Sequence, residues 1–524
     1  MIVKIIFWLK KHEPPVWFLW LLIAVLILRI PSVFEPYSYG DEMIYLTLGE
    51  AVRRGITLYK YIHDNKPPLL YLIAGLSGNL MMLKVILGFW SLVTIYLYYR
   101  LMSLMSKNRT LVKIATIAFG ILTTIPTFEG NIANAEVFMV GPTILAMILL
   151  LKSSYSTQRH PRPDRGSIQT KAWIPCPSNT AGRQARDDNR CKIIINLLLA
   201  GVLFAIAVLF KFPAIFDIPV VFLYWLLTKK PLKKTLAGGI LVFTGFATLI
   251  LGTFVYYFAK GAGPEYLVAA FLQNLGYVSS WTASAQLPFW QKNAGLLIRF
   301  GILVVISLGL FLKHHPIKKE FLFFVLWLIF ALFAVTLSER PYPHYFVQAL
   351  PAVAYFLALL FVDKSIYQVI SILPLSLAIF VLVYFKFWYY PTTPYYTRFL
   401  RYATGQSDKK SYYQDFDRKL PVYYQIAQKV TAETQPSDPV LVWGDAPTIY
   451  ALSKRLPPIK YVAGYHINDF YSWDKVLTDI TTRPPKIIVL EERFQNEKIM
   501  DFLEEHYGFV AFTEGFQIWK LINP

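Results

Sequence analysis

Long apolar stretches alternate with short polar connections along the chain up to about residue 387. A helix that crosses a lipid bilayer needs roughly 20 mostly apolar residues. About eleven stretches approach this length, namely residues 16–34, 81–102, 111–127, 137–151, 193–210, 213–228, 236–258, 294–312, 320–337, 346–362 and 365–387. Residues 67–80 are also apolar, but Gly75 and Gly78 interrupt them, so a short re-entrant or interfacial helix is expected there. The pattern predicts an all-α polytopic membrane domain over residues 1–387.

The pattern changes from about residue 420 onwards. Short apolar runs rich in β-branched residues occur at 440–443 and 487–490. They alternate with helix-like stretches, which cover residues 447–455, 471–482 and 495–506. Alternation of this kind is typical of an α/β fold. We therefore predict a separate α/β domain over residues 388–524, tethered to the last membrane span.

Basic residues predict the orientation of these spans, because Lys and Arg favour cytoplasmic loops. They gather in alternate connections: Lys4, Lys10 and Lys11; Arg100, Lys107, Arg109 and Lys113; Arg159, Arg162, Arg165, Lys171, Arg183, Arg186 and Arg190; Lys229, Lys230, Lys233 and Lys234; Lys313, Lys318 and Lys319. With the spans above, all of these fall on one side. The N-terminus and the basic loop 152–192 are then cytoplasmic, and residues 156–190 are expected to be disordered. A first outer loop (35–80) and the α/β domain lie on the opposite side.

Composition supports a membrane protein and narrows its partners. The chain is 55% hydrophobic and only 16% charged, whereas soluble proteins carry about 25% charged residues. The net charge of +20 would suggest nucleic-acid binding in a soluble protein. Here the basic residues lie in loops between spans, so we expect no nucleic-acid partner. The two cysteines, Cys176 and Cys191, match no zinc or disulfide pattern.

The first outer loop holds the most informative polar residues. Asp41 and Glu42 follow the first span directly, and Lys66 lies where the chain returns to the membrane. A carboxylate can act as a general base on an acceptor hydroxyl, and a cation can offset the charge of a phosphate leaving group. Two structural alternatives stay open. Ser38 and Asp41 have the spacing of a capping box, and Lys66 could snorkel to the membrane interface.

The order of residues in this loop resembles the first outer loop of GT-C glycosyltransferases of the protein O-mannosyltransferase and lipid A aminoarabinose-transferase type. The matching residues are Asp41, Glu42, Tyr45, Gly55, Tyr59, Lys66 and Pro67. Three later segments resemble the family in the same order: residues 131–136 with Glu136, residues 211–213 with Lys211, and residues 340–346 followed by Gln348 and Pro351. The resemblance covers roughly residues 10–360.

The resemblance implies a reaction and a set of roles. The donor would be a sugar on a polyprenyl phosphate in the outer leaflet, with a lipid, glycan or protein acceptor, and the transfer would invert the anomeric centre. Asp41 would be the general base, assisted by Glu42 and Glu136, while Lys66 and Lys211 would bind the donor phosphate. Substrate contacts are expected from Tyr45, Tyr59, His63, Asp64, Arg340, His344 and Tyr345. The resemblance also implies a multi-pass protein of the plasma (inner) membrane of a prokaryote.

Several alternatives remain from the residues alone. Glu136 could be a helix N-terminal charge that satisfies the helix dipole, Lys211 could snorkel, and His344 could be an ordinary loop residue. Some members of the family have a Glu before the Lys of the first loop, where this chain has Asn65. Asn65 therefore puts in doubt any metal site carried over from such members, and a divalent cation is left open as a cofactor. A flippase or transporter for lipid-linked sugars is the alternative function, and a membrane-anchored binding protein is a weaker third.

Overall fold

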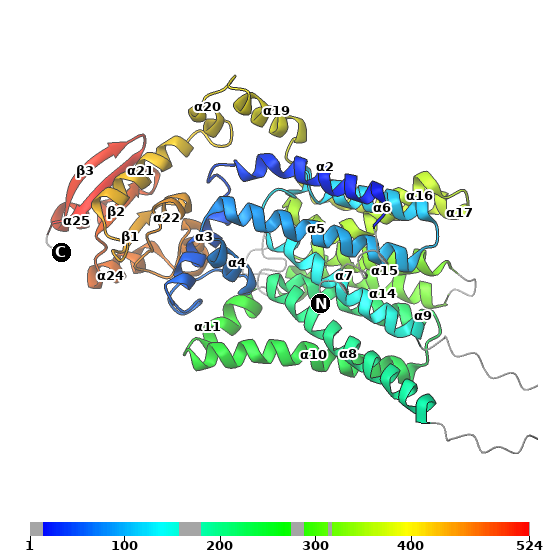
Figure 1. The fold of residues 1–524 in the computed structure, drawn as a ribbon. Coiled ribbons are helices and arrows are strands. Elements are labelled where there is room, and N and C mark those ends of the chain that lie inside the picture. Colours follow the sequence, from blue (N-terminus) through cyan, green and yellow to red (C-terminus); the bar gives the residue numbers. More distant parts are fainter. Residues whose placement is uncertain (1–13, 157–179, 274–287, 313–316, 523–524) are drawn as a thin grey trace, which may run out of the picture.

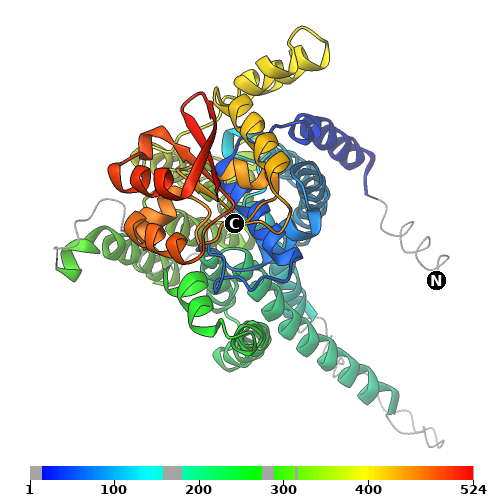
Figure 2. The same cartoon turned by 90° about the vertical axis from the view of Figure 1, so that its left-hand side faces the viewer.

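A computed structural model describes residues 14–156, 180–273, 288–312 and 317–522. A bundle of long helices forms most of the molecule, and a small α/β domain lies at one end of it (Figure 1). Figure 2 looks onto that end, where the α/β domain lies over the helices of the first outer loop. This architecture confirms the predicted fold class, a polytopic helical protein with a C-terminal α/β domain.

Seven helices within the described residues are long and apolar enough to cross a membrane. They are α2 (Val16–Val33), α5 (Leu80–Met105), α7 (Ala135–Ser156), α8 (Thr180–Phe210), α10 (Leu232–Ala259), α14 (Ala294–Leu312) and the pair α17 (Ile366–Ile370) and α18 (Ile372–Tyr384). The other four predicted spans coincide with shorter elements: α6 (Arg109–Leu122), η2 (Phe212–Asp217) continued by α9 (Ile218–Leu227), α15 (Lys319–Val335) and α16 (Leu350–Val362). The count of about eleven spans stays a prediction.

Burial separates the lipid-facing helices from the central ones. In α14 and α10 only 6% and 17% of the spanning window is buried, so apolar side chains cover their outer surfaces. In α15, by contrast, every residue from Phe321 to Val335 except Val325 is buried. Glycines allow α8 and α10 to cross closely, because a Cβ at Gly201 or Gly245 would collide with backbone of the facing helix. Small residues commonly permit such contacts in membranes, where the hydrophobic effect cannot drive helix association.

The first outer loop folds into two packed helices, α3 (Gly40–Arg53) and α4 (Leu69–Ser77). The N-cap of α3 is Tyr39, and Asp41 lies inside the first turn. Asp41 is therefore not the capping residue that its spacing from Ser38 allowed. Helix α4 is the short helix expected within residues 67–80, and it ends at Gly78 in the left-handed conformation, with φ 67°.

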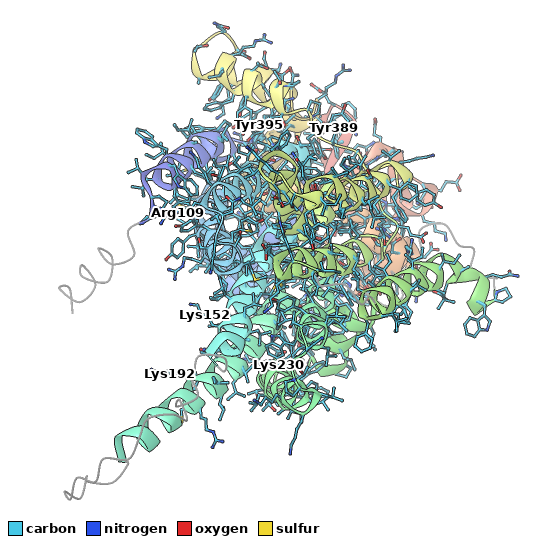
Figure 3. The ribbon with its side chains drawn as sticks, turned by 90° about the vertical axis from the view of Figure 1, so that its right-hand side faces the viewer. Arg109, Lys152, Lys192, Lys230, Tyr389 and Tyr395 are labelled. Atoms are coloured by element: carbon cyan, nitrogen blue, oxygen red, sulfur yellow. The ribbon has the colours of Figure 1, made fainter. Side chains whose placement is uncertain are left out.

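The described parts of the predicted cytoplasmic connections that Figure 3 labels lie at the end of the bundle opposite the α/β domain. Figure 3 faces this end and labels the basic residues Arg109, Lys152, Lys192 and Lys230. The prediction of a disordered segment over 156–190 was wrong at its C-terminal end, because α8 already begins at Thr180. This part is free of proline and contains Ala, Gln and Arg, which favour helix beyond the apolar span. Residues 157–179 lie outside the described part.

The α/β domain contains a four-stranded sheet in the order β1-β2-β4-β3. Strands β1 (Val440–Trp443) and β2 (Ile487–Glu491) are parallel, and β4 (Phe516–Leu521) pairs antiparallel with both β2 and β3 (Tyr507–Thr513). Both predicted strand runs are therefore strands, whereas the hairpin β3–β4 was not predicted. The helices of this part are α19 (Thr392–Ala403), α20 (Lys409–Gln414), α21 (Leu420–Glu433), α22 (Pro447–Ser453), α23 (Gly464–Phe470), α24 (Trp473–Thr482), the 3-10 turn η5 (Glu492–Phe494) and α25 (Glu497–His506).

Short elements complete the connections. They are the 3-10 turns η1 (Pro126–Phe128) and η4 (Pro343–Gln348), α11 (Gly263–Leu267), a π-helical turn η3 (Val268–Leu272) and α13 (Phe289–Lys292). Turn η4 contacts both α7 and α15 and carries His344 and Tyr345, which line the cavity described below.

Candidate active site

A cavity of about 930 Å³ lies between the helical bundle and the α/β domain. Its polar lining comes from residues far apart in the sequence: Tyr39, Asp41, Asn65, Lys66, Glu136, Lys211, Asn293, Ser338, Arg340, Tyr342, His344, Tyr345, Gln348, Tyr465, His466 and Asp469. A second part of the lining is apolar and comes from η2, α14 and α15, with Phe216, Phe300 and Phe333 among its residues. The cavity thus combines charged groups with an apolar wall built by membrane helices.

Asp41 projects into this cavity from the first turn of α3. Its Oδ2 accepts a hydrogen bond from the Tyr45 hydroxyl at 2.9 Å and lies 3.6 Å from Lys66 Nζ. Burial alone would raise the pKa of Asp41, but the charge of Lys66, the nearby His344 and the Tyr45 hydroxyl lower it below its ordinary value. The carboxylate is therefore ionised at neutral pH, as a general base must be.

Lys66 links Asp41 to a second carboxylate. Its Nζ lies 3.5 Å from Oδ2 of Asp64, which is completely buried directly behind the cavity lining. Asp64 also accepts a hydrogen bond from the backbone N–H of Asn65 at 2.7 Å. Burial would raise the pKa of Asp64, yet the charge of Lys66, the nearby His466 and hydrogen bonds with the Tyr71 hydroxyl and the Asn65 N–H hold it well below the usual range. The lysine is thus fixed between two carboxylates from one loop.

A second charged group forms where α7 begins and α8 ends. Lys211 Nζ lies 2.9 Å from Glu136 Oε1 and 4.8 Å from the centre of the Tyr345 ring. His344 Nε2 lies 4.0 Å from the same Glu136 oxygen. The structure therefore brings together Glu136, Lys211, His344 and Tyr345, which belong to three segments that sequence analysis treated separately.

Glu129 completes this group and was missed by sequence analysis. Its Oε2 contacts His344 Nδ1 and accepts hydrogen bonds from the Tyr39 hydroxyl at 2.8 Å and from Asn134 Nδ2 at 2.9 Å. Burial lowers the pKa of His344, but Glu129 and Glu136 outweigh it, so the net pKa is raised. Glu129 lies in a turn with φ 57°, and its sequence neighbourhood gives no signal of this role.

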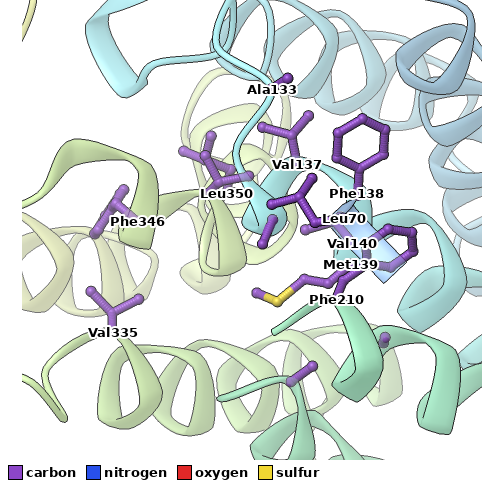
Figure 4. Packing of buried hydrophobic residues seen from close by; sticks show 14 of the residues in the cluster. Leu70, Ala133, Val137, Phe138, Met139, Val140, Phe210, Val335, Phe346 and Leu350 are labelled. Carbon is purple, nitrogen blue, oxygen red and sulfur yellow. The ribbon is translucent and has the colours of Figure 1, made fainter. Parts of the chain in front are cut away.

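Aromatic packing next to the cavity holds the start of α7 against the end of α8. The rings of Phe138 and Phe210 stack with centroids 5.5 Å apart, next to Met139 on the cavity wall. Figure 4 shows this apolar cluster with Val335 and Leu350 around it. Because Phe138 follows Glu136 by two residues and Phe210 precedes Lys211 directly, this stack holds the two charged residues near each other.

Glu42 lies apart from the cavity lining, although it was predicted as catalytic. Its carboxylate lies 2.8 Å from Lys84 Nζ and accepts a hydrogen bond from the backbone N–H of Ala133 at 2.7 Å. Lys84 also contacts Glu35 at 2.6 Å. Burial raises the pKa of Glu42 above its ordinary value, against the opposing charge of Lys84. Glu42 thus ties α3 to α5 and to the segment before α7.

Four predicted substrate-binding residues lie behind the cavity lining. Tyr45 supports Asp41, and Tyr59, itself at φ 70°, donates a hydrogen bond to the carbonyl of Lys66 at 2.9 Å. His63 packs against Tyr461 of the α/β domain, with ring centroids 5.3 Å apart, and Asp64 holds Lys66. The other three, Arg340, His344 and Tyr345, line the cavity.

Helix α23 of the α/β domain adds residues that sequence analysis missed. Tyr465, His466 and Asp469 line the cavity together. They lie more than 400 residues from Asp41 in the chain and match no motif, so only the folded structure reveals their proximity. As for metal binding, no cluster of three or more His, Cys, Asp or Glu side chains suited to an ion occurs within the described residues.

No protein-family model matches the sequence, and no curated protein matches it either. Solved structures are similar in fold. ArnT from Cupriavidus metallidurans bound to undecaprenyl phosphate is 14% identical, with a TM-score of 0.52, and the match covers 96% of this chain and 97% of that one. The apo state of the same protein gives 13% identity, a TM-score of 0.50 and the same coverage. The likeness confirms the GT-C resemblance at the level of the fold.

Proposed function

We propose that this chain is a membrane glycosyltransferase that moves a sugar from a polyprenyl-phosphate donor to an acceptor on the outer face of the membrane. One observation carries the proposal: a single cavity holds an ionised carboxylate, two lysines and an apolar wall of membrane helices. A polyprenyl phosphate has both an anionic head and a long apolar tail, so it matches both kinds of lining. The undecaprenyl phosphate bound to the ArnT of similar fold supports this choice of donor class.

The residues suggest a single displacement. Asp41 accepts the proton of the acceptor hydroxyl or amine. The acceptor atom forms a bond to the anomeric carbon while the bond from that carbon to the phosphate oxygen breaks on the opposite face. Polyprenyl phosphate leaves with the electron pair of the broken bond, and the configuration inverts. Lys66 keeps Asp41 ionised, because its positive charge favours the carboxylate form.

Lys66 and Lys211 would bind the phosphate as charge develops on it. Each lysine lies against carboxylates of the protein and is thereby held in place before the donor arrives. Arg340, His344 and Tyr345 would contact the sugar or phosphate from η4 and the loop before it. Glu136 would orient Lys211, while Glu42, Tyr45, Tyr59, His63 and Asp64 would support the first outer loop.

We place the protein in the plasma (inner) membrane of a prokaryote, with its N-terminus in the cytoplasm and the α/β domain outside. The acceptor would be a lipid, a glycan or a protein. The alternative function, transport of a lipid-linked sugar, moves the donor across the bilayer unchanged.

The test uses purified protein in liposomes that contain a labelled polyprenyl-phosphate hexose, with membrane extract as acceptor. Release of free polyprenyl phosphate together with a labelled product supports a glycosyltransferase. Intact labelled donor that reaches the opposite leaflet, without release of polyprenyl phosphate, contradicts the proposal and favours the transporter.

A further inference from the structure

Helix α23 is held firmly against the carboxyl end of the parallel strands β1 and β2. The backbone N–H of Gly464, its first residue, donates a hydrogen bond to Asp445 Oδ1 at 3.0 Å. A Cβ at Gly464 would lie 2.7 Å from the carbonyl oxygen of Gly444, so only glycine permits this approach. Asp445 follows β1, and its own N–H donates to Glu491 at the end of β2, at 3.1 Å. The sheet therefore fixes the position of α23.

The first outer loop docks onto the segment that leads into α23. The backbone N–H of His63 donates to the carbonyl of Lys460 at 2.8 Å, and His63 pairs with Tyr461 in a short parallel bridge. The His63 ring also packs against Phe470, with centroids 5.5 Å apart. The loop that contains Asp64 and Lys66 is thus joined to the α/β domain by both backbone and side-chain contacts.

His466 lies at the centre of this junction. It is only 2% exposed, and its Nε2 lies 3.5 Å from Oδ1 of Asp64. The opposite oxygen of Asp64 faces Lys66, which in turn faces Asp41. A continuous series of contacts therefore runs from a helix of the α/β domain to the Asp41 carboxylate on the cavity lining.

We propose that His466 is a positioning residue, which holds Asp64 and, through it, sets the place of Lys66 for the donor phosphate. This inference rests on the proposed function, because it assigns Lys66 to the phosphate. A buried carboxylate keeps a defined orientation only while its contacts hold it. The loss of His466 would remove the side-chain contact of Asp64 Oδ1 and leave the backbone N–H of Asn65 to hold that oxygen. The α/β domain is then a component of the site.

The test measures binding and turnover separately. Full-length protein in nanodiscs is titrated with polyprenyl monophosphate to obtain a Kd, and the donor KM and kcat are measured in liposomes. We expect His466→Ala to raise both the Kd for polyprenyl monophosphate and the donor KM about three- to tenfold, in line with the loss of one buried polar contact. His466→Gln should restore most of the donor affinity that His466→Ala loses, since the amide nitrogen of the glutamine reaches a position near that of the histidine Nε2. kcat should fall less than KM rises.

Two further variants separate positioning from general loosening. Phe470→Leu disturbs the packing against His63 and His466 but keeps the imidazole, so its Kd should stay near that of the wild type. In an Asp64→Asn background, His466→Ala should add little, because residues that act through one another are not additive.

The outcomes distinguish this inference from the proposed function. An unchanged Kd in His466→Ala, an equal effect of Phe470→Leu, or full additivity with Asp64→Asn would each overturn it. Wild-type protein that binds polyprenyl phosphate without turnover would overturn the proposed function while the Kd series still tests His466. Wild-type protein that binds no polyprenyl phosphate would overturn both.

Discussion

At the scale of single residues, the site is organised by pairing of opposite charges. Lys66 lies between Asp41 and Asp64, and Lys211 contacts Glu136. These side chains are partly or fully buried, and opposite charges attract each other more strongly in such surroundings than they do in bulk water. Under the proposed function, an incoming phosphate would meet cations whose positions are already fixed, which would lower the cost of organising the site during binding.

Replacing Lys66 with alanine tests its role as a phosphate ligand. We expect Lys66→Ala to raise the donor KM about 10- to 100-fold, because a charge-assisted hydrogen bond contributes about 1.5–3 kcal/mol. Lys60→Ala is the matched control, since Lys60 belongs to the same loop and its Nζ lies over the Tyr61 ring. If both variants keep the wild-type KM, Lys66 is a snorkelling residue and the assignment fails.

His344 makes the stability of the protein depend on pH. The pKa of His344 is raised in the folded state, so protonated His344 stabilises the folded protein. This stabilisation is fully present below the ordinary histidine pKa of about 6.5. It is lost as the pH rises through the pKa of His344 in the folded state. We expect the melting temperature of the wild type to fall as the pH rises through this range. In His344→Gln, the melting temperature should fall less over the same range, because the titrating side chain is absent. His506→Gln, at an exposed position, should show the same fall as the wild type. Identical slopes in wild type and His344→Gln would contradict this assignment.

Sequence order alone identified most of the charged residues in the cavity but not their orientation. Asp41 and Glu42 are neighbours on a helix, where successive side chains point about 100° apart. Asp41 therefore faces the cavity while Glu42 faces Lys84. Tyr45, one turn after Asp41, lies on the same face and reaches it. The different directions of Asp41 and Glu42 can be worked out from the helical period only once the boundaries of α3 are known.

At the scale of elements, close helix contacts hold the first outer loop together. Gly49 of α3 faces α4, and a Cβ at this position would lie 2.5 Å from the backbone nitrogen of Gly75. Backbone cannot move aside as a flexible side chain can. We expect Gly49→Ala to separate α3 from α4 and to reduce stability by about 1–3 kcal/mol, as overpacking of a core does. Thermal unfolding in detergent measures the change.

Gly40→Ala is the matched control for this substitution. Gly40 begins the same helix, and its added Cβ would meet open space. Its stability should stay within about 0.5 kcal/mol of the wild type, as for most surface substitutions. Equal stability of Gly49→Ala and wild type would show that α3 and α4 can separate freely, contrary to the observed packing.

Elements with a clear apolar period were predictable, and those without one were missed. Strands β1 and β2 are buried along their whole length, and residues 440–443 and 487–490 are continuous apolar runs in the sequence. Strand β3 instead exposes Phe509 and Phe512, and an irregularity between Phe509 and Ala511 interrupts its pairing with β4. Such an irregularity breaks the alternation by which a strand is recognised. The start of α8 was missed because its first turns are polar.

At the scale of the whole molecule, the two ends of the bundle have different characters. Basic connections gather at one end (Figure 3), while the cavity and the α/β domain occupy the other. In a Cys176→Ser background, we expect a membrane-impermeant maleimide to label a Ser437→Cys variant in intact cells. Cys191, which is exposed at the basic end, should react only after the membrane is permeabilised.

A Cys176→Ser/Cys191→Ser protein without an added cysteine sets the background of this labelling. Labelling of Cys191 in intact cells, with protection of Ser437→Cys, would reverse the proposed orientation. The sequence could predict that basic connections share one end of the bundle, because loop charge is a local property. The docking of the α/β domain on the first outer loop could not be predicted, since it depends on contacts between segments about 400 residues apart, such as His63 with Tyr461.

The most direct test of the account compares wild type, Asp41→Asn and Glu50→Gln for release of polyprenyl phosphate from a labelled donor in liposomes. Glu50 belongs to the same helix and pairs with Arg53 and Arg54 away from the cavity. We predict that Asp41→Asn loses about 100-fold or more of the rate, because general-base catalysis contributes this much, while Glu50→Gln keeps the wild-type rate. Near-normal turnover by Asp41→Asn would contradict the role of Asp41 as general base, because the reaction would then proceed without its carboxylate.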